Sequence, residues 1–312
     1  MKLIYTLICL ILLLNTSFAQ KFKKSSVITK SDSPLEFNAD LNLSIEDIDS
    51  SLISNELVVK FRMIDSLIEK KDKGKAISLL IEIELKNPEK YYVPLLKGML
   101  YLKLDDLNSS YSLIEKSINL TLNDSIKSSL YYILGILDMR RNLHLNSYEN
   151  FQKAYELDSL NLSTIIVLGY VSRKLNKINK AISLYEKAVK IEPTLNNVWN
   201  NLGFLYQKTE NHKRAKKVFD KIIKDEPKSP LPYSNRSYSN LKLGFNIQAL
   251  KDINKSIKLF PENSYAFKNR ALIYIDLKEL ESACKDINMA LELGYAQKYG
   301  SEVTLLKNEH CE

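Results

Sequence analysis

The side chains that could carry out chemistry are few and lie far apart in this 312-residue chain. It has three histidines, and none has a carboxylate or a second histidine at the spacing that puts two metal ligands on one helical face. The adjacent Asp105 and Asp106 could act as general acid and base, but aspartate at a turn between helices more often caps a helix. Cys284 has no nearby histidine to activate it as a nucleophile. We therefore expect no enzymatic activity, no metal site and no cofactor.

Small residues and prolines recur along the chain at an interval of 34 residues. A single compact domain needs no such period, whereas a stack of similar small units does. Only eight glycines and eight prolines are present, which favours helices over a sheet with many turns. The sequence therefore predicts an all-α solenoid. The recurring residues are Ala181, Ala215, Ala249 and Ala283, then Pro193, Pro227 and Pro261, and finally Gly135, Gly169 and Gly203.

Small and bulky residues alternate at fixed offsets within each period. Counted from Asn196 as position 1, position 8 is small in six of the seven periods, position 20 is small in all of them, and position 24 is bulky in all of them. This is expected where two helices pack closely, because a small residue makes room for a bulky one on the facing helix. The landmarks of the period that starts at Asn196 are Trp199, Leu202, Gly203, Tyr206, Ala215, Phe219 and Pro227.

These landmarks resemble the tetratricopeptide repeat, and the resemblance extends over residues 57–297. Members of that family fold each repeat into two antiparallel helices, A and B, and stack the repeats so that the A helices line the concave side. The resemblance implies a right-handed α-solenoid of about seven repeats. Arg236 and Arg270 depart from the pattern at position 7, and we expect their aliphatic stems to pack while the guanidinium groups reach water. The expected repeats are 57–90, 91–127, 128–161, 162–195, 196–229, 230–263 and 264–297.

Asparagine occupies position 6 of helix A in three successive repeats, as Asn201, Asn235 and Asn269. In members of the family that bind extended peptides, asparagines at this position grip the ligand backbone, and an amide can donate and accept at once. The resemblance therefore implies a peptide-binding groove, although the abundance of asparagine in this chain explains the three residues equally well. The expected groove comprises Asn197, Asn200, Asn201, Phe204, Asn235, Tyr238, Tyr265, Lys268 and Asn269.

Residues 1–19 have the organisation of a secretory signal peptide. Lys2 precedes an apolar run, which is too short to span a membrane, and Ser17 and Ala19 provide small residues at the positions expected for cleavage before Gln20. We therefore expect an exported chain, periplasmic or extracellular, with no stable membrane insertion after cleavage. In an oxidising compartment Cys284 and Cys311 could form a disulfide, with two unpaired thiols as the alternative.

The segments outside the repeats suggest three further elements. Residues 20–43 are polar and show little apolar periodicity, which predicts a flexible leader. Residues 44–56 and 298–312 carry short apolar stripes, which predict an N-terminal and a C-terminal capping helix.

The composition and charge restrict the class of partner. The formal net charge of +8 is a mild surplus without a concentrated basic stripe, so we expect no nucleic-acid partner. The leading interpretation is a non-enzymatic module that binds an extended segment of a protein partner in the concave groove. The alternatives are a structural scaffold of a bacterial envelope complex that uses its convex or edge surfaces, and an accessory subunit of an envelope enzyme.

Overall fold

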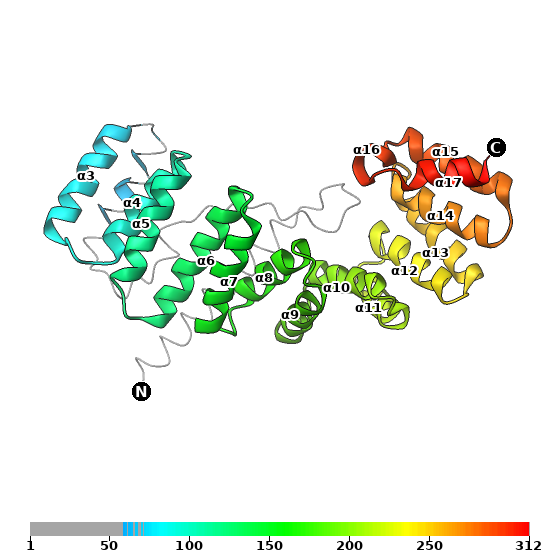
Figure 1. The fold of residues 1–312 in the computed structure, drawn as a ribbon, viewed down its shortest axis with the longest axis horizontal. Coiled ribbons are helices and arrows are strands. Elements are labelled where there is room, and N and C mark those ends of the chain that lie inside the picture. Colours follow the sequence, from blue (N-terminus) through cyan, green and yellow to red (C-terminus); the bar gives the residue numbers. More distant parts are fainter. Residues whose placement is uncertain (1–58, 61, 65, 68–69, 71, 312) are drawn as a thin grey trace. The chain divides into compact units, whose positions relative to one another are not determined.

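The computed structural model describes residues 59–311 apart from 61, 65, 68–69 and 71 (Figure 1). Every regular element in this part of the chain is an α-helix, so the predicted all-α class is confirmed. The chain divides into two compact parts, one ending at Leu184 and the other beginning at Tyr185. The expected signal peptide (1–19), leader (20–43) and first capping helix (44–56) lie outside the described residues. No helix in the described ranges is both long and apolar enough to cross a membrane.

The N-terminal part is a succession of helix pairs. Helix α4 packs on α5 and α6 on α7, while α5 contacts α6 and α7 contacts α8, so each pair is joined to the next. Aliphatic residues between Ile64 and Leu137 form a continuous core through these pairs. The helices are α3 (Lys73–Lys86), α4 (Tyr92–Lys103), α5 (Leu107–Asn119), α6 (Asp124–Arg140), α7 (His144–Leu157), α8 (Leu162–Lys174) and α9 (Ile178–Ile191), the last of which contains the boundary between the two parts.

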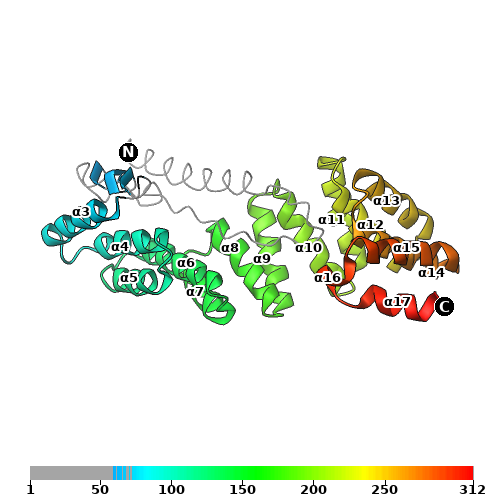
Figure 2. The same ribbon diagram turned by 90° about the horizontal axis from the view of Figure 1, so that it is seen from above.

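The C-terminal part repeats the same arrangement and ends in two short helices (Figure 2). Helices α10, α12 and α14 are the first helices of their pairs and start 34 residues apart, while α16 and α17 close the array against α15. The expected final helix begins at Glu302 rather than at residue 298, because Gly300 has a positive φ of 94° that interrupts the chain. The bounds are α10 (Asn196–Lys208), α11 (His212–Asp225), α12 (Pro230–Lys242), α13 (Asn246–Leu259), α14 (Ser264–Asp276), α15 (Leu280–Glu292), α16 (Tyr295–Tyr299) and α17 (Glu302–His310).

Each turn inside a pair has the same backbone geometry. Position 15 of the repeat takes a left-handed conformation, with φ between 57° and 78°, and the following amide donates back across the end of the first helix. This is the hydrogen bond of a Schellman motif, which ends the helix and reverses the chain. The carboxylate of Asp106 then caps α5 by accepting from the Ser109 amide at 3.0 Å, as its position predicted. The left-handed residues are Asp105, Asn142, Asn176, Glu210, Gly244 and Lys278.

The small residue at position 8 is needed where a large ring faces it. A Cβ atom on Gly203 would lie 2.6 Å from Cζ of Phe219, and one on Gly135 would lie 2.7 Å from the ring of Phe151. Both rings are fully buried, so neither has room to move aside. The close approach predicted between the two helices of a pair is confirmed in these repeats.

Candidate functional site

The candidate site lies on the first helices of the pairs in the C-terminal part. Helices α10 and α12 contact each other, as do α12 and α14, so the first helices form a continuous row. Residues three, four, seven and eleven positions apart share one face of a helix. We call this side the A face, and its residues are Asn197, Asn200, Asn201, Phe204 and Lys208 on α10, Leu231, Ser234, Asn235, Tyr238 and Lys242 on α12, and Tyr265, Lys268 and Asn269 on α14.

The position-6 asparagines lie in the seams between these helices rather than standing free. Asn201, Asn235 and Asn269 are each at most 6% exposed. The Asn235 amide donates to Oδ1 of Asn200 at 3.1 Å, and the Asn269 amide donates to the hydroxyl of Ser234 at 3.2 Å. The donor ends therefore join α12 to α10 and α14 to α12, which holds the row of helices together.

The acceptor ends of two of these amides have no partner. Oδ1 of Asn201 and Oδ1 of Asn269 are buried and accept no hydrogen bond from the part of the chain that the structure describes. An unsatisfied buried acceptor costs about 1–3 kcal/mol. Asn269 thus combines a structural role through its nitrogen with unused acceptor capacity through its oxygen, and Asn201 also has an unused acceptor.

Gln207 is a polar member of the same seam that the sequence analysis missed. Its amide nitrogen donates to the Asn235 carbonyl at 2.6 Å and to the Ser239 hydroxyl at 2.9 Å, and the residue is buried. Gln207 lies six residues after Asn201 in a predicted helix. Its polar side chain was the only feature of the sequence that could have indicated a role in this seam. The seam between α10 and α12 is therefore largely a hydrogen-bonded one.

The accessible part of the A face is aromatic, amide and cationic. Asn197, Phe204 and Tyr238 are partly exposed. The Tyr238 ring lies 5.9 Å from the His212 ring and 5.6 Å from the Lys242 ammonium. Burial, followed by the nearby Glu302 and Glu210 carboxylates, raises the pKa of the Tyr238 phenol. Burial, followed by Lys242, lowers the pKa of His212.

At the last first helix, the A face is covered by the end of the chain. The Lys268 ammonium lies 3.0 Å from Oε1 of Glu302 in α17, and the lysine is only 4% exposed. The Tyr295 hydroxyl donates to the other oxygen of Glu302 at 2.9 Å, and the Tyr265 ring lies within 6.3 Å of both the Tyr295 and Tyr299 rings. Burial, with Glu302 nearby, raises the pKa of Tyr265 to about 12. The predicted groove residues Tyr265 and Lys268 are thus engaged within the chain.

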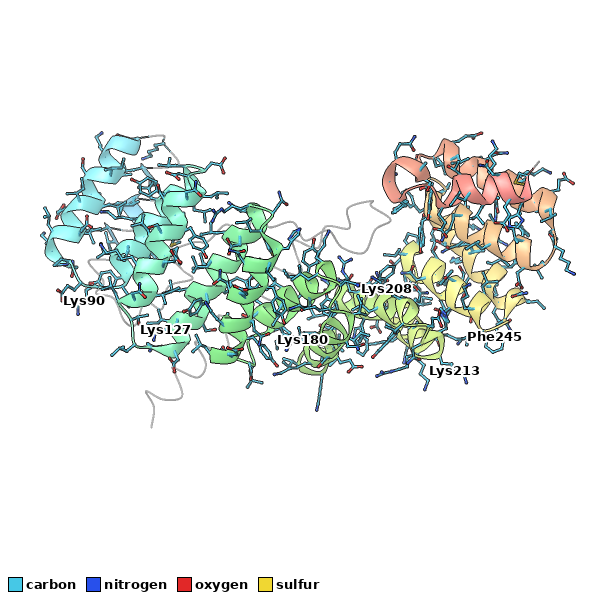
Figure 3. All side chains as sticks on the ribbon, in the orientation of Figure 1. Lys90, Lys127, Lys180, Lys208, Lys213 and Phe245 are labelled. Carbon is cyan, nitrogen blue, oxygen red and sulfur yellow. A yellow bond between two sulfur atoms is a disulfide. The ribbon has the colours of Figure 1, made fainter. Side chains whose placement is uncertain are left out.

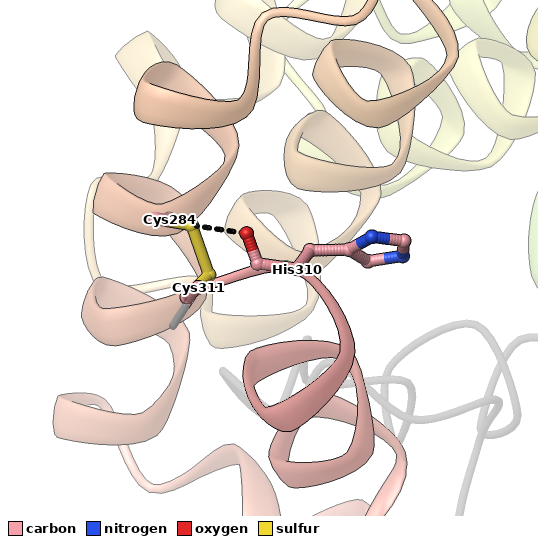
Figure 4. Close-up of a disulfide and its surroundings, with 3 residues drawn as sticks. All are labelled: Cys284, His310 and Cys311. Carbon is pink, nitrogen blue, oxygen red and sulfur yellow. Dashed lines mark hydrogen bonds between the residues drawn. A yellow bond between two sulfur atoms is a disulfide. The ribbon is translucent and has the colours of Figure 1, made fainter.

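A disulfide is a further contact that fixes this end of the chain. Cys284 in α15 and Cys311, directly after α17, are joined with a Cα–Cα distance of 5.5 Å (Figure 4). The Cys284 sulfur also lies 3.3 Å from the His310 carbonyl oxygen. This contact is not a hydrogen bond, because a sulfur in a disulfide carries no proton.

The arginines at position 7 form a network that the sequence analysis did not foresee. The Arg270 guanidinium donates to both oxygens of Asp286, at 2.7 and 2.8 Å, and to Asn254 of the preceding repeat at 2.8 Å. Arg236 makes the same bidentate pair with Asp252 at 2.8 and 2.6 Å. The expectation that these guanidinium groups reach water holds only in part: the arginine side chains are 20% and 21% exposed, and a buried carboxylate sixteen residues later holds each guanidinium group.

The spacing of charge and apolar residues could have revealed this network. Position 23 is aspartate in the two repeats that have arginine at position 7, whereas the repeat starting at Asn196 has Leu202 and Val218 at the same two positions. Burial opposes ionisation of Arg236, but the hydrogen bonds that it donates to Asp252 and Asp220 outweigh burial and raise the pKa of Arg236. These pairs fasten the two helices of a repeat and are not part of the A face.

The most basic stretch of the C-terminal part is solvated. Lys213 of α11 is exposed (Figure 3). Lys217 is exposed as well, and Lys216 pairs with Asp220 at 3.0 Å within the same helix. The described ranges contain no group of three or more histidine, cysteine or acidic residues that could hold a metal ion.

The sequence in the middle of the chain matches models of a known repeat. Residues 169–209 match the TPR repeat, and residues 197–228 match the tetratricopeptide repeat. No curated protein matches the chain. The matched stretch includes α11 and also α10, which is the first of the three helices that form the A face.

Solved structures share the fold at low sequence identity. The C-terminal part of a TPR repeat-containing protein from Cytophaga hutchinsonii has a TM-score of 0.59 and 19% identity, over 78% of this chain and 98% of that one. A tetratricopeptide repeat protein from Parabacteroides merdae has a TM-score of 0.51 and 15% identity, over 80% and 97%. YrrB, described as a TPR protein with an unusual peptide-binding site, has a TM-score of 0.50 and 19% identity, over 63% and 97%.

Together, the periodic helix pairs, the matched repeats and these structures agree on the class of molecule. Repeats of this kind are typically non-catalytic modules for protein interaction. Residues 169–228 therefore match tetratricopeptide repeats, and the described residues have an all-α solenoid fold like that of the solved TPR proteins.

Proposed function

We propose that this protein binds an extended peptide segment of a protein partner along the A face of its C-terminal repeats. The observation that carries the proposal is the row of partly exposed side chains Asn197, Phe204 and Tyr238 on two contacting first helices. Aromatic rings offer apolar contact area, and an amide can pair with a peptide backbone in either direction. YrrB, a TPR protein with an unusual peptide-binding site, supports the same use of the fold.

The buried asparagines contribute to this proposal by making the face rigid. Because Asn235 and Asn269 join neighbouring first helices, the accessible residues are presented in fixed positions, which lowers the entropy lost on binding. Alanine at positions 201, 235 and 269 together would remove the seam as well as any ligand contact. Accessible residues are therefore the better test.

The experiment selects peptides with the full chain from a random displayed library and measures their affinities by fluorescence anisotropy. Phe204→Ala and Tyr238→Ala should each weaken binding at least tenfold, about the effect of removing an aromatic contact at the centre of an interface. Ile247→Ala is the matched control, since Ile247 is 82% exposed on α13, the second helix of its pair. Far-UV circular dichroism checks that all three variants keep their helices.

The control variant also distinguishes the alternative function. If selected peptides or crosslinked partners lose affinity with Ile247→Ala and keep it with Phe204→Ala and Tyr238→Ala, the second helices carry the interaction. A scaffold that uses its convex or edge surface would then replace the peptide-binding groove.

We also propose that the chain is exported to the periplasm or beyond. The supporting observations are the signal-peptide organisation of residues 1–19 and the Cys284–Cys311 disulfide, since disulfides persist in oxidising compartments. Amino-terminal sequencing of the chain purified from its native cells should begin at Gln20. A chain that retains Met1 and stays in the cytoplasmic fraction would contradict export.

A further inference from the structure

The last position of the A face already holds a carboxylate, and this carboxylate belongs to the chain itself. Glu302 lies on α17, outside the repeats, and its side chain pairs with Lys268 of α14 at 3.0 Å. Lys268 is a buried cation whose ammonium also lies 5.0 Å from the Tyr265 ring and 5.8 Å from the Tyr238 ring. The surroundings of Lys268 thus have the composition of a carboxylate site framed by aromatic rings.

The charges around this site favour an acidic occupant. Lys242 lies on the neighbouring first helix, and its ammonium lies 5.6 Å from the same Tyr238 ring. Against these cations stand Glu302 itself and Glu210, which both act on the Tyr238 phenol. With Glu302 removed, Lys268 would be a buried cation without its carboxylate partner, which is an unfavourable state that a ligand carboxylate relieves.

The helix that carries Glu302 packs on α15 through few side chains, with Leu306 partly buried against the core. Helix α17 has nine residues, and Val303 is its one fully buried side chain, while Leu305 is 63% exposed. A helix this short is marginal by itself in water. Its far end is held by the disulfide from Cys311 to Cys284 in α15 (Figure 4).

We propose that Lys268 is a carboxylate-binding site for an acidic side chain of the peptide ligand, that Glu302 is its internal occupant, and that the Cys284–Cys311 disulfide keeps this occupant in place. This inference rests on the proposed function, because it names the ligand chemistry at the end of the same face. A dithiol reductant opens the site by transferring two electrons and two protons to the disulfide, which yields two cysteine thiols and the oxidised dithiol. Helix α17 then leaves Lys268, and a glutamate or aspartate of the peptide replaces Glu302.

The first test examines the latch without any peptide. Hydrogen exchange of the amides of α17 is compared in the oxidised full chain and in Cys311→Ser, with Cys284→Ser as a second variant. Exchange in α17 should become at least about tenfold faster in both variants, because local opening no longer works against a crosslink, while exchange in α12 stays unchanged. Equal exchange in α17 would overturn the latch, whatever the groove binds.

The second test measures the ligand chemistry. The probe is a fluorescein-labelled glutamate-rich peptide with blocked ends, and its twin has glutamine in place of every glutamate. The glutamate peptide should bind Cys311→Ser about tenfold more tightly than it binds the oxidised wild type, because the competent state is then more populated. Glu302→Gln should give a similar gain in the oxidised chain, and the glutamine twin should show none.

Lysine variants decide whether Lys268 is the site. Lys268→Gln in the Cys311→Ser background should abolish the gain for the glutamate peptide, whereas Lys285→Gln should keep it. Lys285 is the matched control, since it is an exposed lysine that pairs with Glu281 on α15. A gain that survives Lys268→Gln, or equal affinity of oxidised and reduced chains for the glutamate peptide, would overturn the proposal. Loss of binding with Phe204→Ala, on α10, tests the groove separately.

Discussion

The contact between Gly203 and Phe219 offers a quantitative test of how this repeat packs. A methyl group at residue 203 would lie 2.6 Å from one ring carbon of Phe219, 2.7 Å from a second, and 3.1 Å from Val218. The ring is fully buried, so it cannot turn into solvent. Gly203→Ala therefore forces the two helices apart or moves the ring off its preferred rotamer.

The size of the effect follows from two opposing contributions. Overpacking of this kind costs about 1–3 kcal/mol. Alanine gains about 1 kcal/mol over glycine from its higher helix propensity, which leaves a net loss of about 0–2 kcal/mol. Phe219→Ile by itself leaves a small cavity beside Gly203 and should cost roughly 1–2 kcal/mol.

The double variant Gly203→Ala, Phe219→Ile should be more stable than the sum of the two losses allows. The chain already contains this combination, because Ala271 and Ile287 occupy the same two positions in the last repeat and both are fully buried. The added methyl group fills the space that the smaller side chain leaves. We expect a favourable coupling free energy of about 1–2 kcal/mol between the two substitutions.

The assay is urea unfolding of the wild type, both single variants and the double variant, followed by the fluorescence of Trp199. This is the only tryptophan in the chain, and it lies on the same helix as Gly203, so it reports on the repeat that is changed even if the array does not unfold in one step. Gly74→Ala is the control, since its Cβ would approach no atom of the described residues closer than 4.0 Å. Its unfolding is followed by far-UV circular dichroism, because Trp199 lies in another repeat. Losses that add to within about 0.5 kcal/mol would refute the argument that the glycine is there to admit the ring.

Three further predictions concern buried charge and the disulfide. Burial raises the pKa of Asp138 above its ordinary 3.8, so the stability that its protonated form gives is complete below that pH and is lost as the pH rises through the raised pKa. Asp138→Asn should therefore raise the melting temperature at neutral pH and leave it unchanged in acid. A gain in melting temperature that persists in acid would contradict this. Arg270→Leu leaves the carboxylate of Asp286 buried and unpaired and should lower the free energy of unfolding in urea by about 3 kcal/mol. Replacing Asp286 with valine as well reproduces the apolar pair of the repeat at 196–229 and should restore most of the lost stability. No recovery in the double variant would contradict the ion-pair argument. Reduction of Cys284–Cys311 opens a loop with a sequence separation of 27 residues and should lower the stability of the C-terminal end by about 3.5 kcal/mol. The measurement is calorimetry with and without a dithiol. Identical unfolding transitions under the two conditions would contradict a stabilising crosslink.

Much of the fold could be predicted because the repeat is a local pattern. Small residues at position 8, bulky residues at position 24 and Asp106 at the turn each act on neighbours within the same helix pair, so their spacing along the chain already encodes the contact. The groove residues followed from the resemblance to the tetratricopeptide repeat together with the period of a helix. What periodicity could not give was their exposure, because a residue on the inner side of one helix can face either a ligand or the next helix.

The sequence by itself determined the all-α class, the length of the repeat and the residues that share the A face, since each depends on spacing within about 34 residues. Only the tertiary structure decided how those residues are used. Asn235 and Asn269 form hydrogen bonds between neighbouring first helices, Lys268 pairs with Glu302, and the arginines at position 7 pair with buried carboxylates. The physical reason is that hydrogen bonds and ion pairs form between the groups that the packing of successive repeats brings within about 3 Å of each other. The spacing of residues along one helix does not determine that distance.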